Sequence, residues 1–277
     1  MTFSIVGRSA DGQSIGVAVA SKFLAVGAAV PAAEADVGAL ATQAFANLAY
    51  RAQGLAMLRT GTAAADVIAG LTAADPGRAT RQLGVVGPAG DGATYTGGEC
   101  FAWAGGVAGD GYAIQGNILA GPAVVAEMER AWLAAPGLTL ARRLHGALAA
   151  GDAAGGDSRG RQSAALFVVR RGAGYSGLSD VEVDLRVDDD PDPVTRMGGL
   201  IGLWELYLGK PDPATLLPLE GALADEVRDR LTALGHADLS GWAGVANLEE
   251  RLVDGAIDPL VLAQLRAASS GGDAPAA

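Results

Sequence analysis

The hairpin at the start of the chain constrains the fold most, because both of its strands are apolar on two faces. The stretch TFSIVGRSADGQSIGVAVA predicts strands over Thr2–Arg8 and Ser14–Ala20, and the Asp11-Gly12 pair between them is a hairpin signal. Neither strand alternates between apolar and polar residues, as a strand with one solvent-facing side would. We therefore expect this hairpin to lie in a sheet that is covered on both sides.

The rest of the pattern predicts a second sheet and two pairs of helices. Val37–Phe45 is a third strand, helices follow at residues 48–61 and 63–74, and strands return in RQLGVVG, GATYTG and GYAIQGN. A second helical pair, GPAVVAEMERAWLAA and TLARRLHGALAAG, precedes the strands SAALFVVRR and VEVDLRV. Helices that come in pairs between groups of strands argue against a doubly wound parallel sheet. We predict an α+β fold, a four-layer α-β-β-α sandwich of two mainly antiparallel sheets with a helix pair on each outer side.

An acidic, proline-containing segment marks a predicted domain junction. The segment is DDDPDPVTRM, and the pattern after it is helical. We expect a sandwich domain over residues 1–190, a small helical module over residues 191–268 and a disordered tail over residues 269–277.

Charge and composition exclude several partners and cofactors. The net charge of −11 argues against binding to nucleic acid or to an anionic membrane. A single cysteine, Cys100, and two histidines, His145 and His236, do not provide the ligands of a cysteine or multi-histidine metal site, so we expect no metal and no organic cofactor. The chain has no secretory signal and no apolar run of about 18 residues, which predicts a cytoplasmic protein. Assembly into a homo-oligomer stays open.

The hairpin geometry gives Thr2 a specific place. With the turn centred on the DG pair, antiparallel pairing sets Thr2 opposite Ala20, within two residues, so Ser21 and Lys22 leave the second strand beside it. We expect removal of Met1, because methionine aminopeptidases act when the next side chain is as small as threonine. Thr2 would then carry a hydroxyl nucleophile and a free α-amine, whose pKa of roughly 7.7–8.0 suits it to accept the hydroxyl proton.

Two further residues are candidates for the reaction itself. The ammonium of Lys22 would disfavour protonation of that amine and stabilise developing negative charge, and lysine is scarce here, since Lys22 and Lys210 are the only ones among 20 basic residues. A solvated strand end is the alternative for Lys22. Asn117, in QGNILAG, could donate its amide to an oxyanion or could cap a turn.

Other polar residues near apolar strands are candidates for substrate binding or for supporting the site. Some interrupt strands and need partners if they are buried, and others gather in the glycine-rich loop GGDSRGRQS, which could equally be a solvated loop with internal ion pairs. His145 lies among leucines, which favours a structural role. Cys100 has no evident histidine and acid beside it, so we do not expect it to be a nucleophile. The candidates of this group are Ser4, Ser21, Thr42, Gln43, Asp157, Arg159, Gln162 and Ser163.

Several motifs in order resemble one known family. They are TFSIVGR, GVAVASKFLAVGAAVP, GALATQAFAN, DPGRATRQLGVV, QGNILAGP and GGDSRGRQSAAL, which together span nearly all of residues 2–190. The chain resembles the bacterial Ntn-hydrolase-like family known as domain of unknown function 1028, and its layout resembles the Ntn-hydrolase superfamily. In proteasome β-subunits of that superfamily, threonine opens the first strand and a nearby lysine supports it. The proteasomal aspartate at the end of the second strand has no clear match, because Ser21 or Lys22 stands there. The later segment GWAGVANLEERL resembles a module described as peptidoglycan-binding.

Three functions follow as expectations. The first is an amidohydrolase in which Thr2 attacks the carbonyl of a small amide and forms an acyl-enzyme, with arginines near the site favouring a carboxylate on the substrate. The second is a catalytically inactive ligand-binding protein on the same fold. The third is an interaction module that uses the C-terminal helices.

Overall fold

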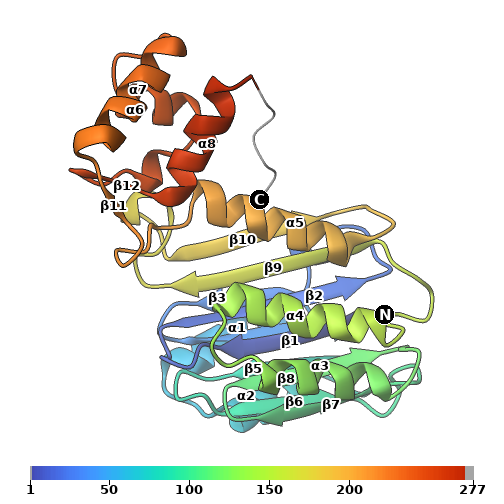
Figure 1. The fold of residues 1–277 in the computed structure, drawn as a ribbon. Helices are drawn as coiled ribbons and strands as arrows, with labels where there is room; N and C mark the ends of the chain where they lie inside the picture. The colour runs from blue at the N-terminus through green and yellow to red at the C-terminus, as the bar shows by residue number, and fades with distance from the viewer. Residues whose placement is uncertain (1, 272–277) are drawn as a thin grey trace. The chain divides into compact units, whose positions relative to one another are not determined.

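Two antiparallel sheets form the centre of the first part of the chain. The structure is a computed structural model that describes residues 2–271, and these residues form a mixed α+β fold with eight α-helices (Figure 1). The chain divides into two compact units, Met1–Gly198 and Gly199–Ala277.

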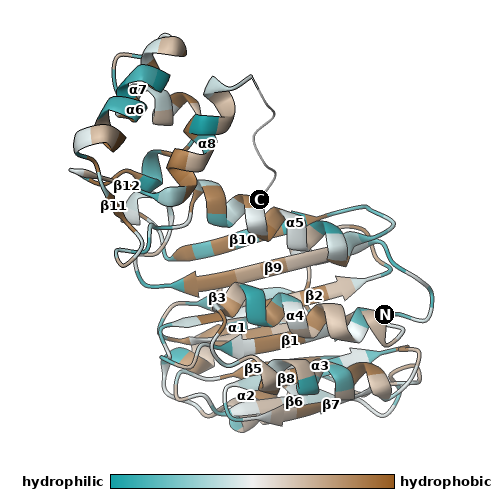
Figure 2. Ribbon diagram, in the orientation of Figure 1, coloured by the Kyte–Doolittle hydropathy of each residue, from teal (hydrophilic) through white to brown (hydrophobic). Residues whose placement is uncertain are grey.

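The larger sheet has six strands and contains the predicted hairpin at its centre. The register pairs Phe3 with Ala20, so the antiparallel hairpin is confirmed, and its second strand ends one residue later than predicted, at Ser21. Figure 2 shows the apolar colour of β1 and β9 in this sheet. The strand order is β10-β9-β2-β1-β8-β7, with β1 Thr2–Arg8, β2 Ser14–Ser21, β7 Gly105–Gly109, β8 Tyr112–Asn117, β9 Ser163–Arg170 and β10 Val181–Val187.

The smaller sheet has four strands. The strand predicted at Val37–Phe45 is confirmed with slightly shorter bounds, and a short edge strand that the pattern did not predict pairs with it. The edge segment PAAE has neither the β-branched residues nor the alternation by which a strand is recognised. The strand order is β3-β4-β5-β6, with β3 Pro31–Glu34, β4 Gly38–Ala44, β5 Arg81–Val86 and β6 Gly92–Thr96.

The two sheets face each other across a core of small side chains. Val6 and Val19 of the larger sheet share one buried cluster with Ala39, Ala41 and Val86 of the smaller sheet. Because side chains alternate along a strand, this cluster fixes which residues of β1, β2 and β4 point between the sheets.

A helix pair packs on the outer face of each sheet. Helices α1 (Ala49–Arg59) and α2 (Ala64–Ala73) cover the smaller sheet, where Leu40 and Leu83 are buried with residues of both helices. Helices α3 (Ala123–Ala134) and α4 (Leu140–Ala153) cover the larger sheet. A side chain at Gly7 of β1 would overlap the Trp132 ring of α3, so glycine permits this close packing.

The second unit is mainly helical and has its own core. Trp242, Leu231 and Leu262 belong to that core, and the buried Arg251 guanidinium pairs with Asp258 at its side. Helix α5 (Pro193–Tyr207) runs across the boundary between the units. The other elements are β11 Leu217–Pro218, α6 Gly221–Ala233, α7 Leu239–Val245, β12 Ala256–Ile257 and α8 Pro259–Ser269.

Four short 3-10 helices complete the described residues: η1 Val26–Ala28, η2 Arg78–Thr80, η3 Tyr175–Gly177 and η4 Glu249–Arg251. Of the predicted tail over residues 269–277, Ser269 ends α8, and residues 272–277 lie outside the described residues, as does Met1. Among the described helices, none is both long enough and apolar enough to span a membrane.

Candidate functional site

Four polar residues lie side by side at one end of the six-stranded sheet. The register pairs Thr2 with Asn117 and Ser21 with Ser163, and it sets Thr2 next to Ser21. We call these four residues the polar row. They share a face with Val6, so their side chains point between the sheets, and all four are buried, with at most 5% of each exposed.

Within the polar row, the hydroxyls of Thr2 and Ser21 are in contact. The distance from Thr2 Oγ1 to Ser21 Oγ is 3.1 Å, and either hydroxyl can donate. The Gln43 side chain donates to the Thr2 carbonyl oxygen at 3.3 Å. The first residue of β1 is therefore held through both its side chain and its backbone.

A buried hydrogen-bond network between the two sheets continues from the polar row. Gln115 Nε2 donates to Ser4 Oγ at 2.6 Å, and Ser4 Oγ donates to Gln43 Oε1 at 2.7 Å. Gln43 Nε2 and Asn117 Nδ2 then both donate to Gln82 Oε1 at 2.8 Å. We call Ser4, Gln43, Gln82 and Gln115 the inter-sheet network. Its members carry no charge, and among the described residues every fully buried side-chain nitrogen and oxygen has a hydrogen-bond partner.

Glycine at one position makes room for this network. Gly84 of β5 lies against the Gln115 side-chain amide, and a Cβ at Gly84 would overlap that amide. A larger residue would therefore displace Gln115 from Ser4, which explains the glycine at this position of β5.

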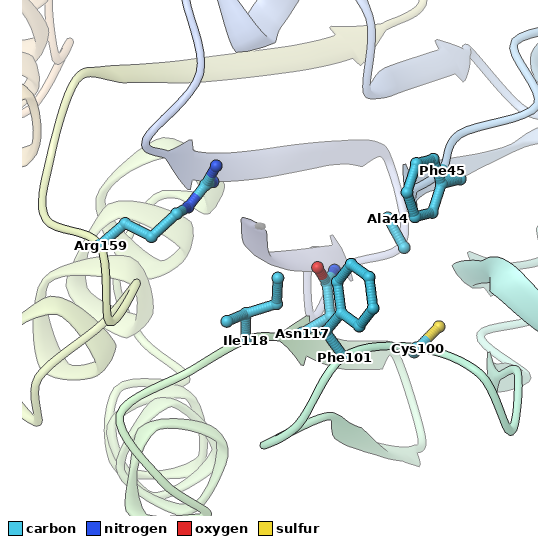
Figure 3. A pocket seen from close by; sticks show the side chains of 7 residues that line it. All are labelled: Ala44, Phe45, Cys100, Phe101, Asn117, Ile118 and Arg159. Carbon is cyan, nitrogen blue, oxygen red and sulfur yellow. The ribbon is translucent and has the colours of Figure 1, made fainter.

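A small cavity opens beside Asn117. Its volume is about 230 Å³, and Figure 3 shows aromatic rings, Asn117 and the Arg159 side chain around it. Since Asn117 is paired with Thr2, the cavity lies next to the polar row. The lining residues are Ala44, Phe45, Cys100, Phe101, Asn117, Ile118 and Arg159.

Two lining residues have strained backbones. Ala44 ends β4 with φ of 66°, and Ile118 follows β8 with φ of 49°. A β-branched residue such as Ile118 rarely adopts positive φ, and such strain costs on the order of 1–3 kcal/mol. Strained residues of this kind are concentrated at ligand sites, which favours a functional role for the cavity.

A buried carboxylate fixes the wall that contains Phe45. Arg81 donates to the Phe45 carbonyl oxygen at 2.6 Å and to Asp75 at 2.9 Å, and the Tyr50 hydroxyl donates to Asp75 at 2.8 Å. The hydrogen bonds from Arg81 and then from Tyr50 hold the pKa of Asp75 well below its ordinary value. Burial, together with the bond to Asp75, raises the pKa of Tyr50.

The glycine-rich loop before β9 is anchored by Asp157. This buried carboxylate accepts from the Lys22 backbone N–H at 2.8 Å and from the Arg159 backbone N–H at 3.0 Å. It also forms an ion pair with the Arg159 guanidinium at 3.1 Å. The loop and the end of β2 are thus tied together, and Arg159 is held at the cavity.

Lys22 follows the last residue of β2, and its hydrogen bonds are with the glycine-rich loop. Its exposed ammonium donates to the Arg161 carbonyl oxygen at 3.2 Å. An electrostatic role of Lys22 at Thr2 stays a prediction, while Ser21 is the neighbour whose side chain contacts Thr2.

The remaining candidates take structural positions or lie away from the polar row. Thr42 points to the helix side of β4, where its hydroxyl donates to the Asn47 carbonyl oxygen at 3.4 Å. Gln162 donates to Asp189 at the surface. Ser163, within the row, donates to the Phe23 carbonyl oxygen and accepts from the Val26 N–H. The thiol of Cys100 has its pKa raised by burial.

Sequence reasoning missed Gln82 and Gln115. Each interrupts an apolar strand, in RQLGVVG and in GYAIQGN, which is the signal that pointed to Gln43. The two cavity aromatics, Phe45 and Phe101, carry no such signal, because exposed loop aromatics have no distinctive pattern. In residues 2–271, no group of three or more histidine, cysteine, aspartate or glutamate side chains is arranged to hold a metal ion.

Comparisons with known proteins agree on one family. A family model described as a family of unknown function, DUF1028, matches residues 2–197. A crystal structure of a Silicibacter pomeroyi protein, described with the same family, is 30% identical in sequence. The similarity covers 81% of this chain and 92% of that chain, with a TM-score of 0.66. No curated protein matches the sequence.

Proposed function

From the premise that this chain belongs to the DUF1028 family, whose function is unknown, we propose that it is an amidohydrolase with an N-terminal threonine nucleophile. The proposal includes the α-β-β-α sandwich of the Ntn hydrolases. It is supported by the packing of one helix pair on the outer face of each of two facing sheets.

The contact between Thr2 and Ser21 carries this proposal. Thr2 begins a central strand, its hydroxyl lies 3.1 Å from Ser21 Oγ, and the cavity beside Asn117 provides space for a substrate next to it. Removal of Met1 would add a free α-amine to the same residue. Nucleophile, proton acceptor and substrate space would then adjoin one another, as covalent catalysis requires.

The reaction proceeds in two balanced steps. Thr2 Oγ1 attacks the amide carbonyl carbon, its proton passes to the α-amine directly or through one water, and the same proton goes to the leaving nitrogen as the C–N bond breaks. A water molecule then attacks the ester carbonyl, gives a proton to the α-amine, and releases a carboxylic acid while the Thr2 hydroxyl takes that proton back. The net change is one amide plus water to one acid plus one amine.

Asn117 would stabilise the negative charge that develops on the carbonyl oxygen. Its Nδ2 is held by Gln82 at 2.8 Å, and a side-chain amide fixed in this way can present its second N–H to the cavity that it lines. A preorganised donor of this kind commonly contributes about 3–4 kcal/mol to transition-state stabilisation.

The hydrogen bond of Lys22 to Arg161 favours a second candidate, a ligand-binding protein without catalysis. In that state the lysine charge is directed to the loop, and the inter-sheet network around Thr2 is neutral. For the second unit, the resemblance of GWAGVANLEERL to a peptidoglycan-binding module stays a prediction, to be tested by sedimentation of the chain with purified peptidoglycan.

A mass measurement and an electrophile test the hydrolase proposal. The intact mass of the purified protein should lack Met1, and a small β-lactone should add its full mass once, at Thr2, because a nucleophilic hydroxyl opens the lactone to an ester. Thr2→Ala should give no adduct, while Thr42→Val, which changes a buried threonine outside the polar row, should still react. Full retention of Met1, or labelling that persists in Thr2→Ala, rejects the threonine nucleophile.

A further inference from the structure

We propose, resting on the proposed function, that the substrate is an N-acyl aromatic amino acid with a free carboxylate. Its ring would pack against Phe45 and Phe101, its carboxylate would pair with Arg159, and its acyl carbonyl would lie between Thr2 and Asn117. Hydrolysis would release the aromatic amino acid and leave the acyl group on Thr2.

Two exposed aromatic rings are the observation that supports an aromatic side chain on the substrate. Phe45 and Phe101 come from separate loops, and their ring centroids lie 6.0 Å apart at 70°, an edge-to-face arrangement. They are 59% and 60% exposed, although both line the cavity together with Ile118. A third ring placed there would cover apolar surface that solvent now reaches, and it could join the edge-to-face geometry.

The Arg159 side chain is the observation that supports a carboxylate on the substrate. It is 43% exposed, while the side chain of Asp157, which holds it, is 2% exposed. Asp157 takes hydrogen bonds from Nε and Nη2, which fixes the plane of the guanidinium at the cavity (Figure 3). A planar cation that is oriented by a buried anion and reaches solvent is suited to a second, incoming carboxylate.

The size of the cavity favours a small substrate. Its volume of about 230 Å³ lies below the range of about 300–1,000 Å³ that drug-sized ligands occupy. The space therefore fits a single side chain with its carboxylate, rather than an extended peptide. Ala44 and Ile118, which both have positive φ, also line that space.

Binding to the full-length Thr2→Ala protein tests the inference without turnover. The probes are N-acetylphenylalanine, N-acetylphenylalaninamide, which lacks the carboxylate, and N-acetylalanine, which lacks the ring; calorimetric titration gives each Kd. N-acetylphenylalanine should bind at least about 10-fold more tightly than either analogue, because each analogue loses one of the two contacts. Adding Arg159→Gln should abolish the preference for the acid over the amide, and adding Phe101→Ala should abolish the preference for the ring. Both side chains are largely exposed, and melting curves verify that each variant is folded.

The outcomes separate this inference from the hydrolase proposal. Equal affinities for the three probes, or preferences that survive both substitutions, overturn the substrate assignment, even where the β-lactone labels Thr2. Selective binding that depends on Arg159 and Phe101 supports the assignment, even where wild-type protein lacking Met1 fails to hydrolyse N-acetylphenylalanine. In that last case the hydrolase proposal falls, and the cavity is a binding site for this class of ligand.

Discussion

Ser21 and Lys22 are adjacent in sequence, but their side chains have different neighbours, and a pair of substitutions separates their roles. Ser21→Ala should lower kcat/KM by about 2- to 10-fold, because the variant loses the hydrogen bond to the Thr2 hydroxyl, worth about 0.5–1.5 kcal/mol. Lys22→Met should raise the apparent pKa of the Thr2 amine if the predicted electrostatic role of Lys22 holds, and should leave the pH–rate profile unchanged if the ammonium serves only the Arg161 carbonyl to which it donates. Both profiles are measured on any amide that the wild type hydrolyses.

The direction of the pKa change follows from the repulsion between two positive charges. An ammonium near the Thr2 amine lowers the pKa of that amine, so its removal would raise the apparent pKa in the profile. An unchanged profile in Lys22→Met rejects the electrostatic role of Lys22, and a kcat/KM of Ser21→Ala close to that of the wild type rejects the role of Ser21.

The surroundings of a candidate residue were predictable from the sequence where strand register and burial determine which side chains lie next to it. The hairpin alone brings Ser21 beside Thr2, and a polar residue inside an apolar strand points to Gln43. Two features depend on contacts that no local pattern encodes. One is the direction of the Lys22 side chain, set by the Arg161 carbonyl some 140 residues later in sequence. The other is the convergence of Phe45 and Phe101 from separate loops.

At the level of strands, Gln43 joins the two sheets through the inter-sheet network. Gln43→Leu should lower the free energy of unfolding by about 1–3 kcal/mol, because Ser4 and Gln82 lose a buried partner while the volume hardly changes. Urea unfolding of the purified variants gives this value.

The adjacent residue of the same strand is the matched control. Thr42 is equally buried but points to the helix side, with one long hydrogen bond of 3.4 Å. Thr42→Val should therefore cost less than about 1 kcal/mol. Equal losses in the two variants would mean that the network adds nothing to the joining of the sheets.

The anchoring of the cavity wall by Asp75 makes stability sensitive to acid. The folded-state pKa of Asp75 is lowered from its ordinary 3.8, so the stabilisation is fully present above that pH and is lost as the pH falls below it, through the folded-state pKa. Asp75→Asn should reduce the melting temperature near neutral pH. The melting temperature of this variant should also fall less steeply than that of the wild type as the pH is lowered. Melting curves from about pH 6 to about pH 2 measure this.

A surface carboxylate provides the reference for that experiment. Asp66 lies exposed in the first turn of α2, and Asp66→Asn shows how the acid profile responds when an exposed carboxylate is removed. If Asp75→Asn and the wild type decline in parallel on acidification, the acid sensitivity has another source.

Long elements with strong patterns were predicted best. The two-sided apolar hairpin and the paired helices were recognisable because periodicity extends over many residues. The short strand β3 was missed, since its four residues form a strand only through pairing with β4. Tertiary pairing, rather than local preference, decides such segments.

For the whole molecule, the first compact unit extends through Gly198, into α5. Val194 and Met197 are buried, and the Val194 carbonyl oxygen lies 2.9 Å from His145 Nε2. A chain ending at Gly198 should melt cooperatively, and one ending at Asp190, the boundary predicted from composition, should melt about 10 °C lower, because two buried apolar side chains are lost.

Calorimetry of both truncated chains tests this expectation. Equal melting temperatures would show that residues 191–198 add nothing to the first unit. The acidic segment DDDPDPVTRM marks a change to a helical sequence pattern. A contact such as that between Val194 and His145 nevertheless extends the first compact unit beyond the start of that segment.

The burial of Thr2 at the very start of β1 has a practical consequence for anyone who purifies the protein. An affinity tag left before Thr2 would keep the strand pairing and the fold, yet it would turn the threonine amine into an ordinary amide. If Thr2 is the nucleophile, such a preparation would be well folded and inert, and its inertness would carry no information about the proposed hydrolase activity. A tag placed after Ala277, or one cleaved to leave threonine first, avoids mistaking a handling artefact for a missing activity.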